Sequence, residues 1–460
     1  MSSPIAPARL AAFTASLAVA SGRLDLSNAV ARARASLVDD RDRALAQDIA
    51  VGVQRWRGAL DYVIGRFARR PIAKLDPEVL EILRLGTYEL LHHSRVPAPA
   101  IVDDAVGLAA RVRKASARGL VNAVLRAIAG SRRETEQLLP QRPADPADRP
   151  AALAYLSITL SHPQWLAERW LDRYGFESAE AWLQFNLSPA PLTLRANPFR
   201  TTTRALVARL EGEHVAVHRG RYAAEAIIVD RGTPLRGRGI DEGWFVVQDE
   251  GSQLLAMLAG VELPARVLDA CASPGGKATA LAARLPPGGL LVACDVRDRR
   301  IELLRRTVAA TGAPNIRLVQ ADLLRPLPFA PVFGCVFVDA PCSGLGTLRR
   351  DPDIKWRRCP EDLALFAARQ QTMLRRAAAV VRPGGRLVYA TCSSEPEENE
   401  SVAEAFLAAS PEFAAVGATE GTGLPPAVVD AAGHLRTAPH LHGLEAFFGA
   451  VFRRMGRGTD

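Results

Sequence analysis

The stretch VLDACASPGGK, residues 267–277, decides the fold of this chain. An apolar run ends in an acid and a glycine turn, and a helical pattern follows, so we expect a strand, a turn and a helix in succession. Glycines in such a turn let backbone N–H groups approach a ligand closely, and the helix N-terminus favours negative charge. A Walker A loop is excluded, because Lys277 is followed by Ala278 instead of Ser or Thr. The turn therefore indicates a nucleoside-like ligand.

The same alternation of strand, turn and helix continues over residues 256–460. Strands are expected at 266–270, 289–295, 316–321, 334–339 and 385–391, and helices at 277–285, 297–311, 362–381 and 397–409. This alternation is typical of a doubly wound, mainly parallel sheet. Ligands of such sheets bind at the carboxyl ends of the strands, so the functional side chains are expected there.

Three successive strands after the glycine turn end in an aspartate, namely Asp295, Asp322 and Asp339. At the end of the second strand, Asp295 can bridge two ribose hydroxyls. Asp322 can accept a hydrogen bond from the exocyclic amino group of an adenine. Each aspartate could instead cap the helix or turn that follows, but three in succession favour a nucleoside site.

Two cysteines also follow strand ends: Cys342 in VDAPCSG (residues 338–344) and Cys392 in LVYATCS (residues 387–393). Carbon 5 of cytosine is a poor nucleophile, but a thiolate that adds at carbon 6 enables carbon 5 to attack a methyl group. A carboxyl group near N3 and the amino group of the ring, here Asp339, would hold and polarise it. Both cysteines could alternatively be small buried hydrophobes.

The remaining cysteines do not suggest a disulfide scaffold or a metal site. Six cysteines in 460 residues form no Cys-x-x-Cys pair, and no histidine cluster has zinc spacing. We expect Cys294 and Cys335, which lie inside expected strands, to be small buried side chains, and we expect no role for Cys359. A reducing, cytoplasmic compartment fits free thiols.

Residues 1–138 are expected to form an all-helical bundle, because apolar residues recur three and four positions apart. The chain carries a net charge of +9, and residues 1–150 hold 23 Lys+Arg against 16 Asp+Glu, so 23 − 16 = +7 lies in the first third. This surplus suggests a polyanionic partner, although an arginine-rich composition without a partner is the alternative. The Ala-rich stretch 10–20 fits a helix better than a signal peptide, and no apolar run suits a membrane span.

Two further segments separate the bundle from the last domain. Residues 139–151 hold a Pro-rich run that favours an extended linker. Residues 152–255 are expected to form a small α+β domain, with helices at 162–174 and 178–184 and strands at 192–195, 226–229 and 244–247.

The motifs at 269–277, 339–344 and 389–393 closely resemble those of S-adenosylmethionine-dependent RNA (cytosine-5)-methyltransferases, the Nop/Sun-like family. RDPDIKW (350–356), EENE (397–400) and QDEGS (248–252) also look like family stretches. LRLGTYELL (83–91) and GLVNAVLR (119–126) resemble the NusB domain, while HPQWL (162–166) and LRAN (194–197) resemble the family's intermediate RNA-binding domain. The resemblance covers nearly the whole chain and extends to the bacterial 16S ribosomal RNA enzymes.

The resemblance implies a Rossmann-like methyltransferase domain (256–460) behind a NusB-like bundle (1–138) and a small α+β domain (152–255). It implies that Cys392 is the nucleophile, that Cys342 assists release and that S-adenosylmethionine is the cofactor. The residues that it places around the cofactor are Cys271, Ala272, Ser273, Pro274, Gly275, Gly276, Lys277, Asp295, Asp322 and Asp339. The expected partner is an unpaired loop of 16S ribosomal RNA, bound by a monomer, with no DNA, membrane or metal.

Three departures from the family pattern are local. Asp351 stands where the family usually has His, Glu445-Ala446 replaces Asp-Gly before Phe447, and Ser273 replaces Ala. Two rival functions remain. A DNA cytosine-5 methyltransferase would share the turn at Pro341-Cys342 but would need neither Cys392 nor the bundle. An antitermination or assembly factor would share the bundle but would not need intact thiols and acids.

Overall fold

The computed structural model describes residues 5–131, 134 and 137–456. The chain divides into two compact units, which are described separately. The first comprises Met1–Pro189 with Leu348–Arg358, and the second comprises Ala190–Thr347 with Cys359–Asp460. The division falls inside the segment 152–255, for which the sequence suggested one small domain.

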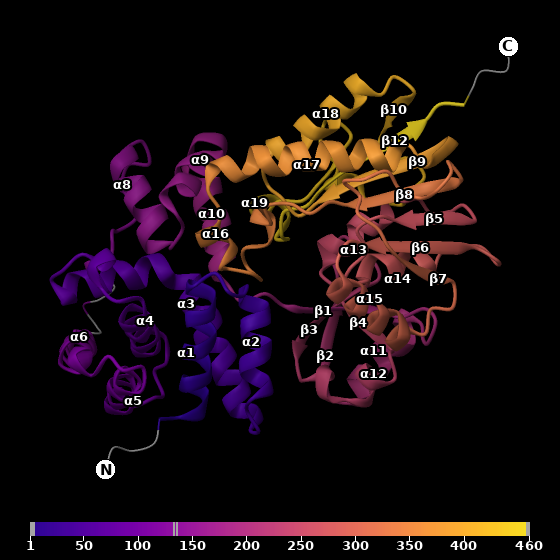
Figure 1. Cartoon of the computed structure of the whole chain (residues 1–460). Helices are drawn as coiled ribbons and strands as arrows, with labels where there is room; N and C mark the ends of the chain where they lie inside the picture. The colour runs from indigo at the N-terminus through magenta and orange to yellow at the C-terminus, as the bar shows by residue number, and fades with distance from the viewer. Residues whose placement is uncertain (1–4, 132–133, 135–136, 457–460) are drawn as a thin grey trace. The chain divides into compact units, whose positions relative to one another are not determined.

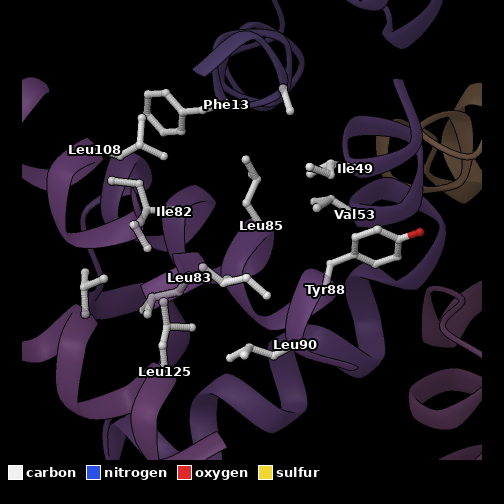
Figure 2. Packing of buried hydrophobic residues seen from close by; sticks show 14 of the residues in the cluster. Phe13, Ile49, Val53, Ile82, Leu83, Leu85, Tyr88, Leu90, Leu108 and Leu125 are labelled. Atoms are coloured by element: carbon white, nitrogen blue, oxygen red, sulfur yellow. The ribbon is translucent and has the colours of Figure 1, made fainter. Parts of the chain in front are cut away.

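The first unit begins with the expected helices. They are α1 (Pro7–Ala20), α2 (Leu26–Ala35), α3 (Asp40–Ala68), α4 (Pro77–His92), α5 (Ala98–Arg111) and α6 (Arg118–Gly130). Their apolar stripes meet in one core, to which Phe13, Ile82 and Leu125 contribute (Figure 2). Gly86 lets α4 approach α6 closely, because a Cβ there would lie 2.7 Å from the Leu125 side chain. The glycine of the motif at 83–91 is therefore a packing requirement.

A second group of helices completes the first unit. They are α8 (Arg149–Ala154), η3 (Tyr155–Thr159), α9 (Gln164–Tyr174) and α10 (Phe176–Leu187). Residues 140–148, within the predicted linker, form neither helix nor strand, and helix begins at Arg149. Trp170 and Trp182 pack against each other in this group, with ring centroids 4.7 Å apart and ring planes tilted by 35°.

A short segment from late in the sequence also packs in the first unit. It is Leu348–Arg358, with helix α16 (Ile354–Arg357). The buried Lys355 donates from Nζ to the backbone oxygen of Arg55 (2.9 Å), and Trp356 donates from Nε1 to the oxygen of Gln54 (2.7 Å). The family-like stretch at 350–356 is therefore part of the helical unit, although the expected methyltransferase sequence surrounds it.

The second unit starts with a small antiparallel sheet in the order β2-β3-β1-β4. Its elements are β1 (Leu192–Ala196), α11 (Thr203–Gly212), β2 (Ala216–Arg219), β3 (Ala226–Arg231), α12 (Arg238–Asp241) and β4 (Phe245–Val247). Three of these strands were expected from the sequence. The fourth, β2, is a mostly exposed edge strand without a buried apolar face. Its sequence therefore shows no alternation of apolar and polar residues from which a strand could be predicted.

The large sheet has the strand order β10-β12-β9-β8-β5-β6-β7, and β11 pairs with β12. Its strands are β5 (Arg266–Asp269), β6 (Leu290–Asp295), β7 (Ile316–Gln320), β8 (Phe333–Asp339), β9 (Val381–Thr391), β10 (Phe413–Val416), β11 (Leu435–Arg436) and β12 (Phe448–Arg454). Strands β5 to β9 pair in parallel, and β10 and β12 add an antiparallel edge. The predicted doubly wound, mainly parallel sheet is confirmed.

Helices cover both faces of this sheet (Figure 1). Successive residues of a strand point to opposite faces, so Val267 packs with α13 (Glu250–Met257), α14 (Gly276–Ala282) and α15 (Asp298–Thr311). Leu268 packs instead with α17 (Pro360–Ala378) and α18 (Glu400–Ala409). Because both faces are buried, the carboxyl ends of β5 to β9 are the edge where polar side chains can gather.

The remaining elements are short connections. They are η1 (Ile72–Lys74), η2 (Ala115–Ala117), η4 (Pro234–Arg236), η5 (Leu345–Thr347), η6 (Pro396–Glu398), η7 (Pro426–Val428) and α19 (Pro439–His442). None of the helices in the described part of the chain combines the length and the apolar character that a bilayer crossing requires.

Candidate active site

The two strand-end cysteines lie against each other. Strands β8 and β9 pair in parallel with Asp339 opposite Ala390, so the residues after both strands emerge at one edge of the sheet. The Sγ atoms of Cys342 and Cys392 are 3.0 Å apart, and both side chains are partly accessible. By contrast, Cys294 and Cys335 are fully buried inside their strands, as expected.

The environment of Cys342 keeps a proton on the thiol pair. The hydrogen bond with Cys392 and burial raise the pKa of Cys342 well above its usual value, and the Cys392 and Glu398 charges add to the effect. A thiolate is the reactive form of cysteine. The raised pKa therefore keeps Cys342 in its thiol form.

An ion pair lies beside the thiols. Lys277, in the first turn of α14, donates from Nζ to Oδ2 of Asp339 at 2.7 Å. Burial alone would lower the pKa of Lys277, but the Asp339 carboxylate and the nearby Cys392 outweigh burial and raise it. The ammonium group therefore stays charged beside the thiols.

The glycine turn is shaped for close approach of a ligand. Gly275 has a φ of +114°, and a Cβ there would meet Leu304 and Thr307 at 3.0 Å, so only glycine fits without strain. The buried Asp295 accepts from the backbone N–H of Ser273 (3.2 Å) and that of Val296 (2.8 Å). It thus joins the turn after β5 to the end of β6.

Asp322 has a more exposed position. Its Oδ1 accepts from the backbone N–H of Leu324 at 2.9 Å, and 35% of its side chain is accessible. This contact is the turn cap that the sequence left open as an alternative. Oδ2 of Asp322 lies 3.8 Å from Nε of Arg325.

Two buried polar atoms at this edge lack a partner among the described residues. They are Oδ2 of Asp269, at the end of β5, and Oγ of Ser273, in the turn. Burial and the neighbouring Asp339 raise the pKa of Asp269 to about 7. Unsatisfied buried polar groups are costly, so these atoms fit a ligand that supplies hydrogen-bond partners, as the amino-acid and ribose groups of S-adenosylmethionine would.

Sequence reasoning missed two residues that border the turn. Asp269 was quoted only as part of a motif. Arg195, on β1, donates from Nε to Gln248 (2.7 Å) and from Nη2 to the oxygen of Gly276 (3.1 Å) and Thr279 (3.0 Å). Burial lowers the pKa of Arg195 to about 10. The stretches at 194–197 and 248–252 were the available signal. The first was interpreted as part of an RNA-binding domain and the second only as a family stretch.

Comparison with known families agrees with this geometry. Residues 256–453 match the family model of 16S rRNA methyltransferase RsmB/F, residues 6–130 match the NusB family, and residues 162–236 match the ferredoxin-like domain of RsmF/B-like methyltransferases. The ferredoxin-like match overlaps the segment that we expected to be a small α+β domain.

Two curated relatives match over most of their length. The chain is 35% identical over 406 residues to ribosomal RNA small subunit methyltransferase B of Pseudomonas putida, covering 88% of this chain and 89% of the relative. It is 32% identical over 378 residues to the protein of the same name from Sodalis glossinidius, covering 82% and 83%.

Solved structures share the fold. The structure of PH0851 matches 99% of this chain and 100% of its own with a TM-score of 0.79 at 23% identity. A methyltransferase homolog protein from Pyrococcus horikoshii matches 66% of this chain and 99% of its own with a TM-score of 0.58 at 25% identity. With a NusB domain before an RsmB/F catalytic domain, the chain belongs to the RsmB/F family of S-adenosylmethionine-dependent ribosomal RNA methyltransferases.

Proposed function

We propose that this enzyme methylates carbon 5 of a cytosine in 16S ribosomal RNA through a covalent bond between Cys392 and the base. The observation that carries the proposal is the pair of sulfurs 3.0 Å apart beside the ion pair of Lys277 and Asp339. A methyltransferase that acts on an oxygen or an exocyclic nitrogen needs no thiol, because those atoms are already nucleophilic. Two thiols at the reacting edge instead suit a carbon that must first be activated.

The first step forms a bond between Sγ of Cys392 and carbon 6 of the ring. Asp339 and Lys277 hold the polar edge of the cytosine and stabilise the charge that develops on it. The electron pair of the carbon 5–carbon 6 double bond then becomes available at carbon 5. S-adenosylmethionine, when bound, would supply the methyl group to carbon 5, and S-adenosylhomocysteine would be the leaving group.

Release requires removal of the proton from carbon 5 and cleavage of the bond between carbon 6 and sulfur. Cys342 is placed to accept this proton. The hydrogen bond with Cys392 is the largest cause of the raised pKa of Cys342, and it is lost once Cys392 becomes a thioether. In the adduct this hydrogen bond no longer raises the pKa of Cys342, so the thiol gives its proton to solvent more readily than in the free enzyme. The thiolate then takes the proton from carbon 5, and the electron pair left at carbon 5 restores the double bond and expels the sulfur of Cys392.

The turn 271–277, Asp295, Asp322 and Asp339 form the proposed cofactor site. Asp295 holds the ribose, and Asp322 lies near the adenine end. Asp269 and Ser273 offer the unpartnered atoms described above. All of these residues lie in the second compact unit, so cofactor binding requires no contribution from the bundle.

The proposed substrate is an unpaired loop of the RNA, bound by a monomer in the cytoplasm. The target base must be unstacked to reach the thiols, which is cheapest where it is not paired. In our proposal, residues 1–138 bind the RNA and residues 256–460 carry out the chemistry. Residues 139–151 form the linker between the first two domains, and residues 152–255 form a small domain that assists RNA binding. Arg9 and Arg84 are buried in ion pairs, so exposed arginines such as Arg111, Arg113 and Arg118 must carry the contact.

Substitution of each thiol tests the chemistry. Cys392→Ala should abolish both methylation and the adduct with 5-fluorocytidine RNA. Cys342→Ala should keep adduct formation and accumulate a protein–RNA species on ordinary RNA in a denaturing gel. Cys359→Ala is the matched control, because Cys359 is exposed, and it should behave as wild type. A full-strength adduct in the Cys392 variant would refute the proposal.

The RNA contact has its own test. Replacing Arg111, Arg113 and Arg118 together by Ala should weaken RNA binding and reduce the slope of log affinity against log salt by about 3, one unit for each lost phosphate contact. Replacing Arg305 and Arg306 by Ala is the control, because both pair with Glu302 on α15. If the two sets of substitutions weakened RNA binding equally, the helical bundle would not be the part that binds RNA.

A further inference from the structure

We propose that Glu398 is the positioning residue that holds the loops of Cys342 and Cys392 together and so fixes the distance between the two sulfurs. The proposal rests on the covalent chemistry proposed above and adds a residue to it. We call Glu398, with its hydrogen bonds to the two loops, the clamp. The clamp would act through the neighbours of the cysteines and would not touch the base or the cofactor.

One buried carboxylate receives hydrogen bonds from both cysteine loops. Oε1 of Glu398 accepts from the backbone N–H of Ser343 at 2.8 Å, and Oε2 accepts from Oγ of Ser393 at 2.6 Å. Ser343 directly follows Cys342, and Ser393 directly follows Cys392. Glu398 has no accessible surface, so water does not compete for these bonds.

A helix on one face of the sheet contributes the third donor. Gln370, on α17, donates from Nε2 to Oε1 of Glu398 at 2.9 Å and to the backbone oxygen of Pro341 at 3.0 Å. The hydroxyls of Ser343 and Ser393 also lie 3.1 Å apart. Three neutral donors thus converge on one carboxylate, and two of them come from the residues next to the thiols.

Glu398 is itself fixed in place. The hydroxyl of Tyr389, on β9, donates to the backbone oxygen of Glu398 at 2.5 Å. The neighbouring Asn399 accepts from Thr391 at 2.6 Å and donates to the backbone oxygen of Ser393 at 3.0 Å. Because the clamp is anchored to β9 on both sides, it can transmit the geometry of the strand end to the thiols.

The consequence for catalysis is specific. Without the carboxylate, the N–H of Ser343 and the hydroxyl of Ser393 lose a buried acceptor, and the two loops are free to separate. A shift of about 1 Å between reacting groups can lower a rate by roughly a hundredfold. The cofactor turn has separate contacts through Asp295 and Arg195, so affinity for S-adenosylmethionine should not change.

The test compares Glu398→Ala with Glu398→Gln. The amide oxygen of Gln can still accept from Ser343 and Gln370, and its NH₂ group can donate to Ser393, whose hydroxyl then turns toward Ser343. A positioning role is therefore rescued by Gln and lost with Ala. Glu404→Gln, at an exposed site on α18, is the matched control.

The first measurement needs no RNA. Phenylarsine oxide bridges two thiols that lie close together, and intact-mass titration of the full chain reports its affinity. Glu398→Ala should bind it about tenfold more weakly, as expected for the loss of a buried hydrogen-bonding group, while Glu398→Gln and Glu404→Gln should match wild type. Unchanged affinity in Glu398→Ala, or equal loss in both Glu398 variants, would overturn the clamp.

The second measurement is the rate of adduct formation with 5-fluorocytidine RNA at saturating cofactor. We expect the rate to fall in Glu398→Ala and to be restored in Glu398→Gln. If wild type binds the arsenical but forms no adduct, the proposed function fails while the clamp stands. If Glu398→Ala does not fold, Ser393→Ala removes one arm of the clamp and should show the same loss of arsenical affinity; wild-type affinity in that variant would also overturn it.

Discussion

Two buried acids, one in each compact unit, have different surroundings. In the helical unit, both oxygens of Glu89 accept from Nε of Arg9 at 2.9 Å, so the acid is neutralised by a buried cation. At the strand ends of the second unit, Asp269 keeps one oxygen without a partner among the described residues. An acid that is paired serves the scaffold, whereas an acid that keeps a free oxygen at a strand end is available to a ligand.

The largest expected effect belongs to the scaffold acid. Among the described residues, Glu89→Ala leaves the buried Arg9 with Asp104 as its remaining ion-pair partner. Breaking a buried ion pair typically costs about 3–5 kcal/mol. We expect chemical denaturation of the full chain to show this loss. Turnover per folded molecule should stay unchanged, because Glu89 lies in the other unit from the thiols. The double change Arg9→Met with Glu89→Leu should recover much of the stability, and no recovery would contradict the pairing argument.

The strand-end acid next to the thiols should show the reverse. Asp339→Asn removes the charge opposite Lys277, and loss of one electrostatic contact to a reacting group lowers turnover by roughly 10²–10³. Single-turnover methylation measures the effect. Unfolding should change less than in Glu89→Ala, because the Asn oxygen can still accept from Lys277. Near-normal turnover would place Asp339 with the scaffold acids.

The sequence predicted the carboxyl edge of the large sheet because the patterns that mark this edge are local in the sequence. The alternation of apolar residues and the glycine turn at 275–276 mark the strand ends, and Cys342 and Cys392 follow them directly. Glu398 was quoted only within a motif, because its partner Ser343 lies 55 residues away. Its role depends on β8 and β9 pairing, which no local pattern records.

Other misses have the same origin. Strand β9 starts at Val381, four residues before the expected start at 385, although Pro383, Gly384 and Gly385 argue against a strand interior. The segment Leu348–Arg358 packs with the helical unit through Lys355. Its sequence neighbours belong to the catalytic domain, so sequence order alone assigned it there. In both cases, contacts between residues far apart in the sequence determine the structure.

The pH dependence of stability sharpens the comparison at Asp269. Its folded pKa of about 7 lies above the value of 3.8 expected in the unfolded chain. Between these values the folded protein binds a proton that the unfolded chain has lost, so stability falls as pH rises through this window and levels off above pH 7. Asn cannot ionise, and Asp269→Asn should therefore gain about 2 kcal/mol over wild type between pH 5.5 and 8. Parallel pH profiles of the two proteins would contradict this.

The smallest effect is expected at Asp322, and it separates the two acids proposed to face the nucleoside. Asp295 is buried, with 4% of its side chain accessible, whereas Asp322 is 35% accessible and already caps the turn at Leu324. Loss of a buried partner costs roughly 1–3 kcal/mol, so Asp295→Ala should weaken S-adenosylmethionine binding by about tenfold or more. Water can replace much of what an exposed carboxylate offers, so Asp322→Ala should weaken it by less than about threefold. Calorimetry on the full chain measures both, with Glu404→Gln as the unchanged control. Equal losses for the two aspartates would mean that the cofactor shields Asp322 from solvent and that its cap at Leu324 is secondary to ligand binding.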